Sequence, residues 1–371
     1  MRERVLITGG AGFIGSHLCD ALLAAGYDVR LYDNLNPQVH GNGAWPSYLT
    51  KHAELQCGDM RDAARLGRAL EGIDDVVHLA ASVGVGQSMY EIADYVGVND
   101  CGTANLLQLL SKKPARKLVV ASSMSVYGEG RYRTAPGAIV DNAVRSDGAI
   151  RAGAWDPVDE RGEALVPIPT PEEKVPDLAS VYALTKFSQE RMCLLVGKAY
   201  GMSTVALRFF NVYGTRQALS NPYTGVLAIF ASRLMNGNPP MIFEDGGQLR
   251  DFVHVRDVAQ ACRSAIEAAP TADGVYNVGT GRGVSIAELA DRMRTLLGRP
   301  DLKPQLTGRY RIGDVRHCFA EIKKARHALG FDPKVGLNEG MAELVEWVRC
   351  EAPRDQVDFA TRELSRRGLV A

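Results

Sequence analysis

A glycine-rich turn near the N-terminus constrains the fold of this chain more than any other feature. Residues 8–15 read TGGAGFIG; they follow an apolar run at 5–7 and precede a helical pattern over 16–25. A strand, a tight turn and a helix in this order present free N–H groups of the first helical turn to a phosphate. Glycine suits the turn because the backbone must bend sharply and come close to both the phosphate and the next strand. The segment therefore predicts a site for a dinucleotide.

A carboxylate at the end of the next apolar run indicates which dinucleotide is bound. Asp33 directly follows the run at 29–32. At this place a carboxylate bonds the ribose hydroxyls of NAD and repels the 2′-phosphate of NADP. No Lys or Arg lies between Asp33 and Lys51 to neutralise such a phosphate. The expected cofactor is therefore NAD.

Short apolar runs, separated by segments with helical spacing, recur along much of the chain. The helical segments include 94–112 and 180–200. Alternating strands and helices predict an α/β fold with a doubly wound (Rossmann) parallel sheet, whose buried strands are almost entirely apolar. The expected strands are 4–8, 29–33, 54–58, 75–80, 117–121, 203–208 and 274–278.

Two regions break this alternation. Residues 129–176 are polar and rich in Pro and Gly, so we expect a long surface insertion rather than part of a sheet. After residue 209, short helices at 285–298 and 338–350 predict a smaller, mixed α/β lobe that binds the substrate, and the tail suits one more amphipathic helix. The predicted division is a cofactor domain at 1–208 and 251–279, a substrate domain at 209–250 and 280–352, and a tail at 353–371.

Composition excludes several classes of protein. The chain has 43 basic and 43 acidic residues, so no overall charge attracts nucleic acid or anionic lipid. Its seven cysteines are scattered and form no C-x-x-C pair, which indicates a reducing compartment and neither a zinc site nor a disulfide framework. The first strand begins almost at once, and no apolar run is long enough to cross a bilayer. We expect a cytoplasmic protein without a metal, a nucleic-acid partner or a membrane partner.

Tyr182 and Lys186 stand four residues apart in a helical segment and therefore share one face. A nearby ammonium favours the phenolate, so we expect it to lower the pKa of Tyr182 towards that of a general base. The same pair occurs on ordinary helix surfaces, so its spacing alone does not decide the function.

Serines follow the apolar run at 117–121, where the carboxyl end of a parallel strand gathers catalytic and binding groups. Ser123 has a hydroxyl that could bond a substrate oxygen as it changes between alcohol and carbonyl. The neighbouring serines are also well suited to turns and helix caps.

Together, the glycine turn with Asp33, Ser123 ahead of Tyr127, and Tyr182 with Lys186 resemble the extended short-chain dehydrogenase/reductase family of nucleotide-sugar enzymes. The likeness spans about residues 4–350 apart from the insertion. Further matching segments follow in order at Gly58-Asp59, 78–81, Asn99, 208–214, 250–258, 276–279 and 311–317.

The resemblance implies a role for each matching position. Ser123, Tyr182 and Lys186 would be catalytic, and Asp59 would hold the adenine. Arginine suits the diphosphate of the substrate because its donors form a fixed fork. The implied cofactor-binding residues are Gly9, Gly12, Phe13, Ile14, Gly15, Asp33, Asn34, Asp59, Met60, Leu79, Ala80, Ala81, Asn99, Tyr182 and Lys186. The implied substrate-binding residues are Ser125, Asn211, Arg250, Arg311 and Cys318, and a homodimer through helices at 94–111 and 180–200 is implied as well.

The residues before Tyr127 separate the reactions that share this scaffold. The family's 4,6-dehydratases and decarboxylases carry a carboxylate two positions before that tyrosine, and its 3,5-epimerases carry a cysteine one position earlier. Here Ser125 and Met124 occupy these places. Epimerisation or 4-keto reduction remains, and Asp33 disfavours the NADPH that reductases often use. The resemblance therefore implies an NAD-dependent 4-epimerase, with a 4-keto reductase and a non-catalytic NAD-binding protein as the alternatives.

The identity of the sugar depends on weaker signals. Cys318, a small residue four after Asp314, stands where related epimerases limit the bulk of the sugar. Segments 171–174, 221–226 and 241–246 most resemble the branch that acts on dTDP-L-rhamnose. That nucleotide sugar is the expected substrate, with a UDP-hexose or UDP-N-acetylhexosamine as the alternative.

Overall fold

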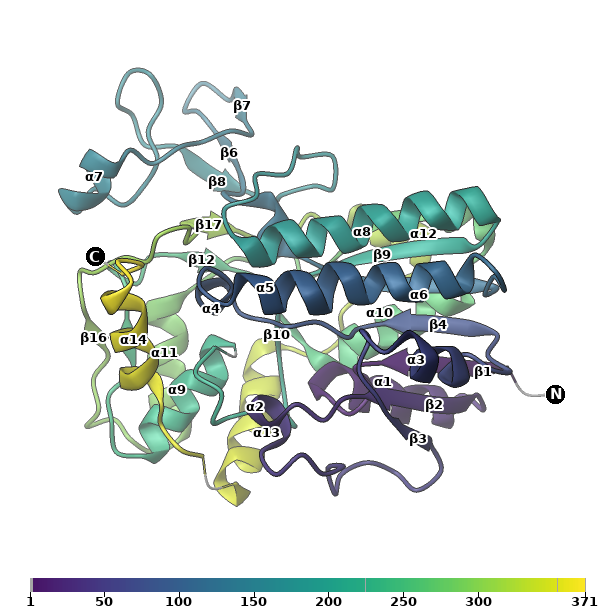
Figure 1. Cartoon of the computed structure of the whole chain (residues 1–371). Coiled ribbons are helices and arrows are strands. Elements are labelled where there is room, and N and C mark those ends of the chain that lie inside the picture. The colour runs from purple at the N-terminus through teal and green to yellow at the C-terminus, as the bar shows by residue number, and fades with distance from the viewer. Residues whose placement is uncertain (1–2, 224, 352, 371) are drawn as a thin grey trace.

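The computed structural model describes residues 3–223, 225–351 and 353–370. Its centre is a seven-stranded sheet in the order β14-β9-β5-β4-β1-β2-β3, with every pair of neighbours parallel (Figure 1). The predicted doubly wound fold is thus confirmed, and each strand lies on an expected apolar run. The strands are β1 (Arg4–Thr8), β2 (Asp28–Asp33), β3 (Glu54–Cys57), β4 (Asp75–His78), β5 (Lys117–Ser123), β9 (Ser203–Phe209) and β14 (Gly274–Val278).

Six of the seven strands are buried on both faces, which explains why they are largely apolar, whereas the edge strand β3 (sequence ELQC) is mostly exposed. Val5 and Ile7 of β1 enter one hydrophobic core, and Leu6 enters the core on the opposite face. Alternate residues of a strand point to opposite faces, so a strand between two layers of helices needs apolar side chains at every position.

Helices cover both faces of the sheet. α1 (Phe13–Ala24), α10 (Val255–Glu267) and α12 (Lys323–Leu329) pack on one face, and α3 (Ala63–Ala69), α6 (Gly102–Leu110) and α8 (Val181–Tyr200) pack on the other. The expected helix at 94–112 is three joined pieces: α5 (Ile92–Tyr95), a π-helical turn (Val96–Cys101) and α6. Three short elements border the sheet, namely α2 (Pro37–His40), α4 (Val85–Ser88) and a 3₁₀ turn (Met124–Tyr127), and another 3₁₀ turn (Pro270–Ala272) precedes β14.

A third hydrophobic core lies beside the sheet and joins α9 (Val226–Met235), α11 (Ile286–Leu296) and α13 (Leu337–Cys350). Small strands connect this lobe to the sheet, while the tail forms α14 (Val357–Arg366). The exact division into domains stays a prediction. The strand groups are β10 (Asn211–Tyr213) with β13 (Phe252–His254), β11 (Met241–Ile242) with β16 (Gln305–Leu306), and β12 (Leu249–Arg250) between β15 (Val284–Ser285) and β17 (His317–Cys318).

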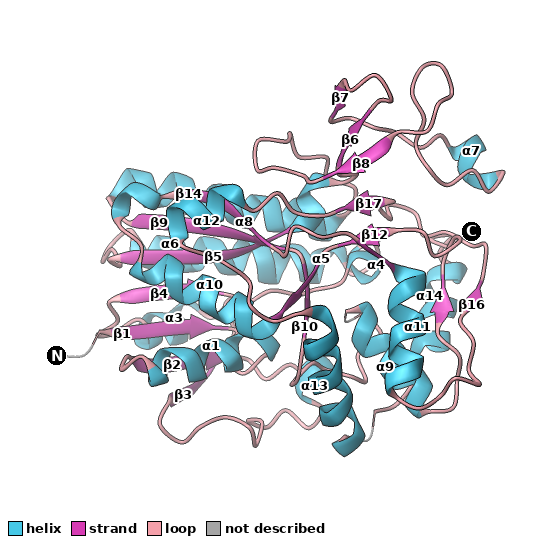
Figure 2. Cartoon of the chain, turned by 180° about the vertical axis from the view of Figure 1, so that it is seen from behind, coloured by secondary structure: helices cyan, strands magenta, loops and turns pink. Residues whose placement is uncertain are grey.

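The insertion at 129–176 differs from its expectation. It contains a small antiparallel sheet of β6 (Arg131–Arg133), β7 (Ile139–Val140) and β8 (Val166–Ile168), together with α7 (Asp147–Arg151). The prediction that it holds no sheet element is wrong, because Tyr132, Ala143 and Leu165 form a core of their own. The insertion stands at one corner of the molecule, next to β12 and β17 (Figure 2).

Within the described residues, no helix is both long and apolar enough to cross a membrane. All seven cysteines lie in this part of the chain, and each is a free thiol.

Candidate active site

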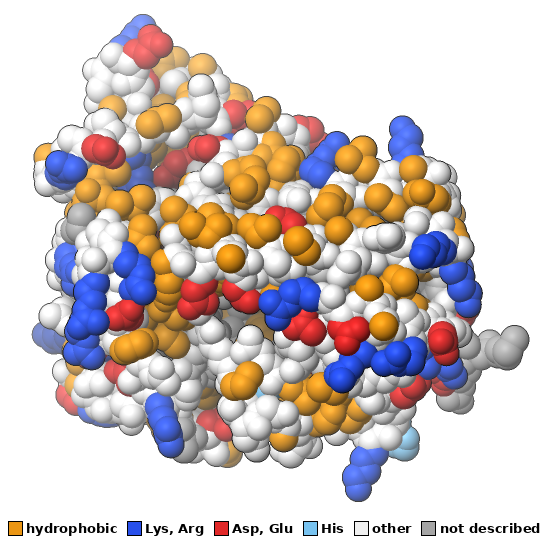
Figure 3. All heavy atoms as spheres, in the orientation of Figure 1, with side chains coloured by type: hydrophobic (Ala, Val, Ile, Leu, Met, Phe, Trp, Pro, Cys, Tyr) orange, Lys and Arg blue, Asp and Glu red, His pale blue; other side chains and the backbone are white. Residues whose placement is uncertain are grey.

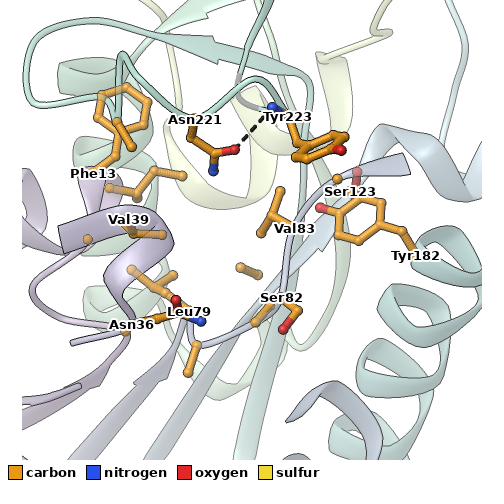
Figure 4. A pocket seen from close by; sticks show the side chains of 18 of the residues that line it. Phe13, Asn36, Val39, Leu79, Ser82, Val83, Ser123, Tyr182, Asn221 and Tyr223 are labelled. Carbon is orange, nitrogen blue, oxygen red and sulfur yellow. Dashed lines mark hydrogen bonds between the residues drawn. The ribbon is translucent and has the colours of Figure 1, made fainter. Parts of the chain in front are cut away.

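The strand order reverses at β1, whose neighbours β2 and β4 lead to opposite edges of the sheet. Such a reversal opens a crevice beyond the carboxyl ends of the strands, where ligands bind in this type of fold. A cavity of about 540 Å³ lies there (Figure 4). It brings together most of the predicted site residues: Gly9, Gly12, Phe13, Ile14, Gly15, Asp33, Asn34, Asp59, Met60, Leu79, Ala80, Ala81, Ser123, Ser125, Tyr182, Lys186 and Asn211.

The glycine turn forms a close-packed cradle at one wall of this cavity. Gly9 has a φ of +69°, and a Cβ there would lie 2.8 Å from the backbone nitrogen of Ala80. A Cβ on Gly15 would lie 2.5 Å from the carbonyl oxygen of Gly9. Helix α1 begins at Phe13, and its N-cap residue Gly12 supplies no side-chain hydrogen bond to the first turn. The first-turn N–H groups therefore suit a pyrophosphate.

Asp33 lies at the end of β2 with its carboxylate at the cavity wall. Its two oxygens accept from the backbone N–H groups of Ala11 at 3.0 Å and Leu35 at 2.9 Å, which fix its orientation. His40 approaches it to 3.7 Å, but burial lowers the pKa of His40 more than Asp33 raises it. A neutral imidazole does not offset the negative charge of Asp33, so the geometry fits ribose hydroxyls rather than a 2′-phosphate.

Asp59 lines the same cavity. Arg61 donates to it from its backbone N–H at 2.8 Å and from its guanidinium at 2.9 Å, and Asn34 donates at 3.2 Å. These bonds hold the pKa of the Asp59 carboxyl well below its usual range. A permanently charged acceptor beside Met60 fits the exocyclic amino group of an adenine.

Asn99 is the one predicted cofactor residue that does not line the cavity. It is fully buried; its side chain accepts from the N–H of Ser82 at 2.8 Å and donates to the carbonyl of Ser82 at 3.1 Å. It also donates to Thr185 of α8 at 2.9 Å. Asn99 therefore orients the segment after β4 against the helix that carries Tyr182.

Ser123, Tyr182 and Lys186 meet at the inner end of the cavity, where Ser123 and Tyr182 point toward one another (Figure 4). Ser125 donates to the Ser123 hydroxyl from its backbone N–H at 3.1 Å and its own hydroxyl at 2.9 Å. Ser88 of α4 accepts the backbone N–H of Tyr182 at 3.0 Å. The Ser123 hydroxyl is thereby held from the turn after β5, and the backbone of Tyr182 is held from α4.

The electrostatics of Tyr182 differ from the sequence-based prediction. Burial raises the pKa of Tyr182 above its usual 10.0, and its hydrogen bond with Ser123 offsets only part of that rise. Burial likewise lowers the pKa of Lys186 to about 8. The Nζ of Lys186 donates to Oε1 of Gln189 at 2.8 Å. The predicted lowering of the Tyr182 pKa by Lys186 is wrong, because withdrawal from water dominates and the opposing effect comes from Ser123.

The predicted substrate residues separate into two groups. Asn211 lines the cavity, and its buried Oδ1 has no hydrogen-bond partner within the described residues. Such an orphaned polar atom is costly in a stable fold and indicates a ligand. Arg250, Arg311 and Cys318 lie outside the lining.

Those three residues are held by other parts of the chain. Arg250 donates to Asp314 at 3.2 Å, and Arg311 donates to the same carboxylate at 2.9 Å. Cys318 is 1% exposed and packs with Val126 and Tyr127, because a small thiol suits a buried apolar cluster. The structure therefore does not bring Cys318 to the cavity, where a residue that limits the sugar is expected.

Several lining residues were not predicted from the sequence. Gln38 and Gln87 exchange two hydrogen bonds, at 3.0 and 3.1 Å, and Gln38 also donates to Asn221 at 3.3 Å. They connect α2, α4 and the loop after β10 at the mouth of the cavity. Val83 lines the cavity with 53% of its side chain exposed. The only signal in the sequence for Val83 and Gln87 is that they lie in the segment between β4 and α5.

Comparison with known proteins agrees with this geometry. The chain matches the family described as the NAD dependent epimerase/dehydratase family over residues 5–143 and 161–279. It is 34% identical to the dTDP-L-rhamnose 4-epimerase of Burkholderia thailandensis over 361 residues, which cover 95% of this chain and 96% of that protein. It is also 32% identical to a putative UDP-glucose 4-epimerase of Methanocaldococcus jannaschii, across 93% of this chain and 98% of that protein.

Solved structures share the whole fold. The UDP-glucose 4-epimerase of Thermotoga maritima with UDP-glucose has a TM-score of 0.76 and 32% identity, covering 94% of this chain and 99% of that one. The UDP-glucose 4-epimerase of Thermus thermophilus in complex with NAD has a TM-score of 0.75 and 32% identity, covering 94% and 100%. The chain is therefore a member of the NAD-dependent epimerase/dehydratase family and belongs with its nucleotide-sugar 4-epimerases.

Proposed function

We propose that this protein interconverts the C4 epimers of a nucleotide sugar, with dTDP-L-rhamnose as its substrate. The observation that carries the reaction is the pair of hydroxyls of Ser123 and Tyr182, which face each other at the inner end of the dinucleotide cavity. A protein that only binds NAD does not need a facing pair of hydroxyls next to its cofactor site.

In the proposed reaction, Tyr182 removes the proton from the C4 hydroxyl of the sugar while Ser123 holds the same oxygen. The chemistry that a bound NAD would supply is uptake of a hydride from C4 and its return to the opposite face, for which the sugar would have to turn about its diphosphate link. Lys186, whose ammonium is buried beside this site, would bond the nicotinamide ribose and favour the phenolate. Tyr182 then returns its proton to the C4 oxygen.

The side chains before Tyr127 support epimerisation rather than elimination. A dehydratase needs an acid and a base to remove a C5 proton and expel the C6 hydroxyl. Met124 and Ser125 line the cavity at this point, and neither can serve as that acid or base. A 4-keto sugar formed here would therefore be held until it is reduced again.

The choice of a 6-deoxy sugar has support from one further side chain as well as from the Burkholderia relative. Val83 lines the cavity that contains Tyr182, and it is 53% exposed. An apolar branch at the sugar end suits a methyl substituent and offers no hydrogen bond to a hydroxyl. UDP-glucose, the substrate named for other relatives, carries a hydroxyl at C6 and is the alternative that must be tested.

A panel of nucleotide sugars tests this proposal. The protein is incubated without added cofactor with dTDP-L-rhamnose, UDP-glucose or UDP-N-acetylglucosamine, and proton NMR follows each C4 signal. We expect a C4 epimer from dTDP-L-rhamnose at the highest rate. A strict need for stoichiometric NADH or NADPH, with a 4-keto sugar consumed, would overturn the epimerase proposal and support the reductase.

We also propose a homodimer in the cytoplasm. Apolar side chains gather along the outer face of α8 and the neighbouring helices (Figure 3). Ile92, Leu184, Leu195 and Tyr200 are each at least half exposed there. A patch of this kind on paired helices suits a four-helix contact with a second copy. Light scattering tests it, and a monomer at micromolar concentration would contradict it.

A further inference from the structure

A buried cluster of charged side chains fastens the insertion to the substrate lobe. We call it the docking cluster. Two of its members, Glu244 and Arg316, are 3% and 2% exposed, which is rare for ionised groups. The docking cluster consists of Glu129, Arg145 and Asp156 from the insertion and Glu244, Asp245 and Arg316 from the substrate lobe.

Arg145 is one of the members that reach from the insertion to the substrate lobe. Its guanidinium donates to Glu244 at 2.7 Å and to the carbonyl of Asp314 at 2.7 Å, and it pairs with Glu129 at 3.1 Å. Arg145 falls within residues 144–160, which the family match omits, as does Asp156. These contacts therefore belong to a segment in which this chain departs from its family.

Arg316 completes the other half of the docking cluster. It donates to the second oxygen of Glu244 at 2.9 Å, to Asp156 at 2.7 Å and to Asp245 at 3.0 Å. Burying guanidinium groups is costly unless their donors meet acceptors, and such a network fixes relative position more than it adds stability. A passive surface loop needs no connection of this kind.

The backbone at Glu244 is a second, independent sign of function. Its φ is 54°, in the left-handed region that favours glycine. A non-glycine residue costs free energy there and persists where its side chain is needed. Glu244 also fixes the backbone beyond Arg309, because its own N–H donates to the carbonyl of Arg309 at 2.7 Å.

The docking cluster adjoins both arginines that are predicted to bind the substrate diphosphate. Arg250 donates to the carbonyl of Arg316 at 2.9 Å, and Arg311 lies 4.8 Å over the ring of Phe243, the residue before Glu244. Glu129 accepts the backbone N–H of Arg316 at 2.7 Å. The segment around Asp314, which contacts both arginines, is thus held from the insertion side.

We propose that Glu129, Arg145 and Glu244 are positioning residues that hold Arg250 and Arg311 in place for the diphosphate of the substrate. This rests on the proposed function, since it takes the two arginines as the diphosphate site. The insertion then acts on substrate affinity without touching the sugar or the cofactor. If the insertion were detached from the substrate lobe, the segment at 311–317 could move, and the guanidinium groups of Arg250 and Arg311 would be misaligned.

Glu244→Gly is the sharpest test. Glycine relieves the left-handed φ and keeps the N–H bond to Arg309, while Arg145 keeps Glu129 and Arg316 keeps Asp156 and Asp245. Calorimetry measures the Kd of dTDP and of thymidine for the purified full chain. We expect the Kd of dTDP to rise about tenfold, a loss of about 1.4 kcal/mol, and that of thymidine to change less than about twofold. The KM of the nucleotide sugar should rise in parallel, with kcat within about threefold.

Two further variants separate positioning from general damage. Arg145→Met should repeat the selective loss of dTDP affinity, whereas Arg151→Met, an exposed residue of the same insertion, should not. Unchanged dTDP affinity in Glu244→Gly and Arg145→Met would overturn the proposal. So would equal losses for dTDP and thymidine, or a loss of bound NAD, because these indicate collapse of the lobe. A wild-type protein that binds dTDP but turns over no sugar would refute the proposed function and leave this inference standing.

Discussion

The glycine turn offers the most direct structural test of the cofactor site. In Gly15→Ala, the added Cβ would lie 2.5 Å from the carbonyl oxygen of Gly9 and 2.8 Å from the Cα of Gly10. Real Cβ atoms essentially never approach within 3.0 Å, and both neighbours are backbone atoms, so the turn must shift by about 0.5 Å or more. Forcing an extra carbon into a packed site costs about 1–3 kcal/mol.

That displacement moves the N–H groups that face the pyrophosphate, so part of the cost should be measured as lost affinity. We expect the Kd of NAD to rise about tenfold to a hundredfold, as measured by quenching of protein fluorescence. Gly67→Ala is the matched control, because its Cβ would meet only a leucine methyl at 3.7 Å and alanine favours the helix. A Gly15→Ala protein with a lower Tm but an NAD affinity within twofold of wild type would refute the role of this turn.

Other perturbations test the remaining parts of the site. Ser123→Ala should lower kcat by about 10²-fold with bound NAD retained, because the hydroxyl that holds the C4 oxygen is lost. Steady-state kinetics measures this change, and a much smaller decrease in kcat would contradict the role of Ser123. Val83→Ser should shift the ratio of kcat/KM between dTDP-L-rhamnose and a 6-hydroxy sugar by about tenfold towards the latter; an unchanged ratio would exclude Val83 from the sugar site. Burial lowers the pKa of His78 from 6.5 to about 3, so the unfolded chain gains a proton near pH 6 that the folded chain gains only near pH 3. As the pH falls from about 6 to about 4, the contribution of His78 to the free energy of unfolding should therefore fall by up to about 1.4 kcal/mol per pH unit. Urea titrations at several pH values measure this free energy, and in His78→Gln its decrease over that pH range should be smaller by that amount.

Features encoded locally could be predicted from the sequence. Six of the seven strands of the main sheet are apolar runs whose residues enter cores on both faces, and a glycine turn needs no distant partner to be recognised. Asp33 and Tyr182 could be found because each has a set distance from a neighbouring motif. The predicted helices at 180–200, 285–298 and 338–350 likewise correspond to α8, α11 and α13.

Features that depend on distant contacts could not be predicted. Gln38 and Gln87 form their paired hydrogen bonds only because α2 and α4 meet across the cavity. The three strands of the insertion are two or three residues long, too short for a periodic pattern. The pKa of Tyr182 was predicted from its neighbour Lys186, but the burial that dominates it follows from the packing of the whole crevice.

The docking cluster shows the same limit. Arg145 is an isolated charge in a polar segment, and only the fold brings it to Glu244, far along the chain. Cys318 was placed by analogy at the sugar site, yet the packing around Tyr127 takes it into an apolar cluster.

Proton NMR of the reaction in D₂O tests the proposed chemistry most directly. If C4 is oxidised and reduced by a cofactor that stays bound, dTDP-L-rhamnose should be converted to its C4 epimer without added nicotinamide. The product should keep its original hydrogen at C4, and Tyr182→Phe should slow the conversion by about 10²-fold or more. Deuterium at C4 of the epimer, or near-normal conversion by Tyr182→Phe, would contradict this mechanism.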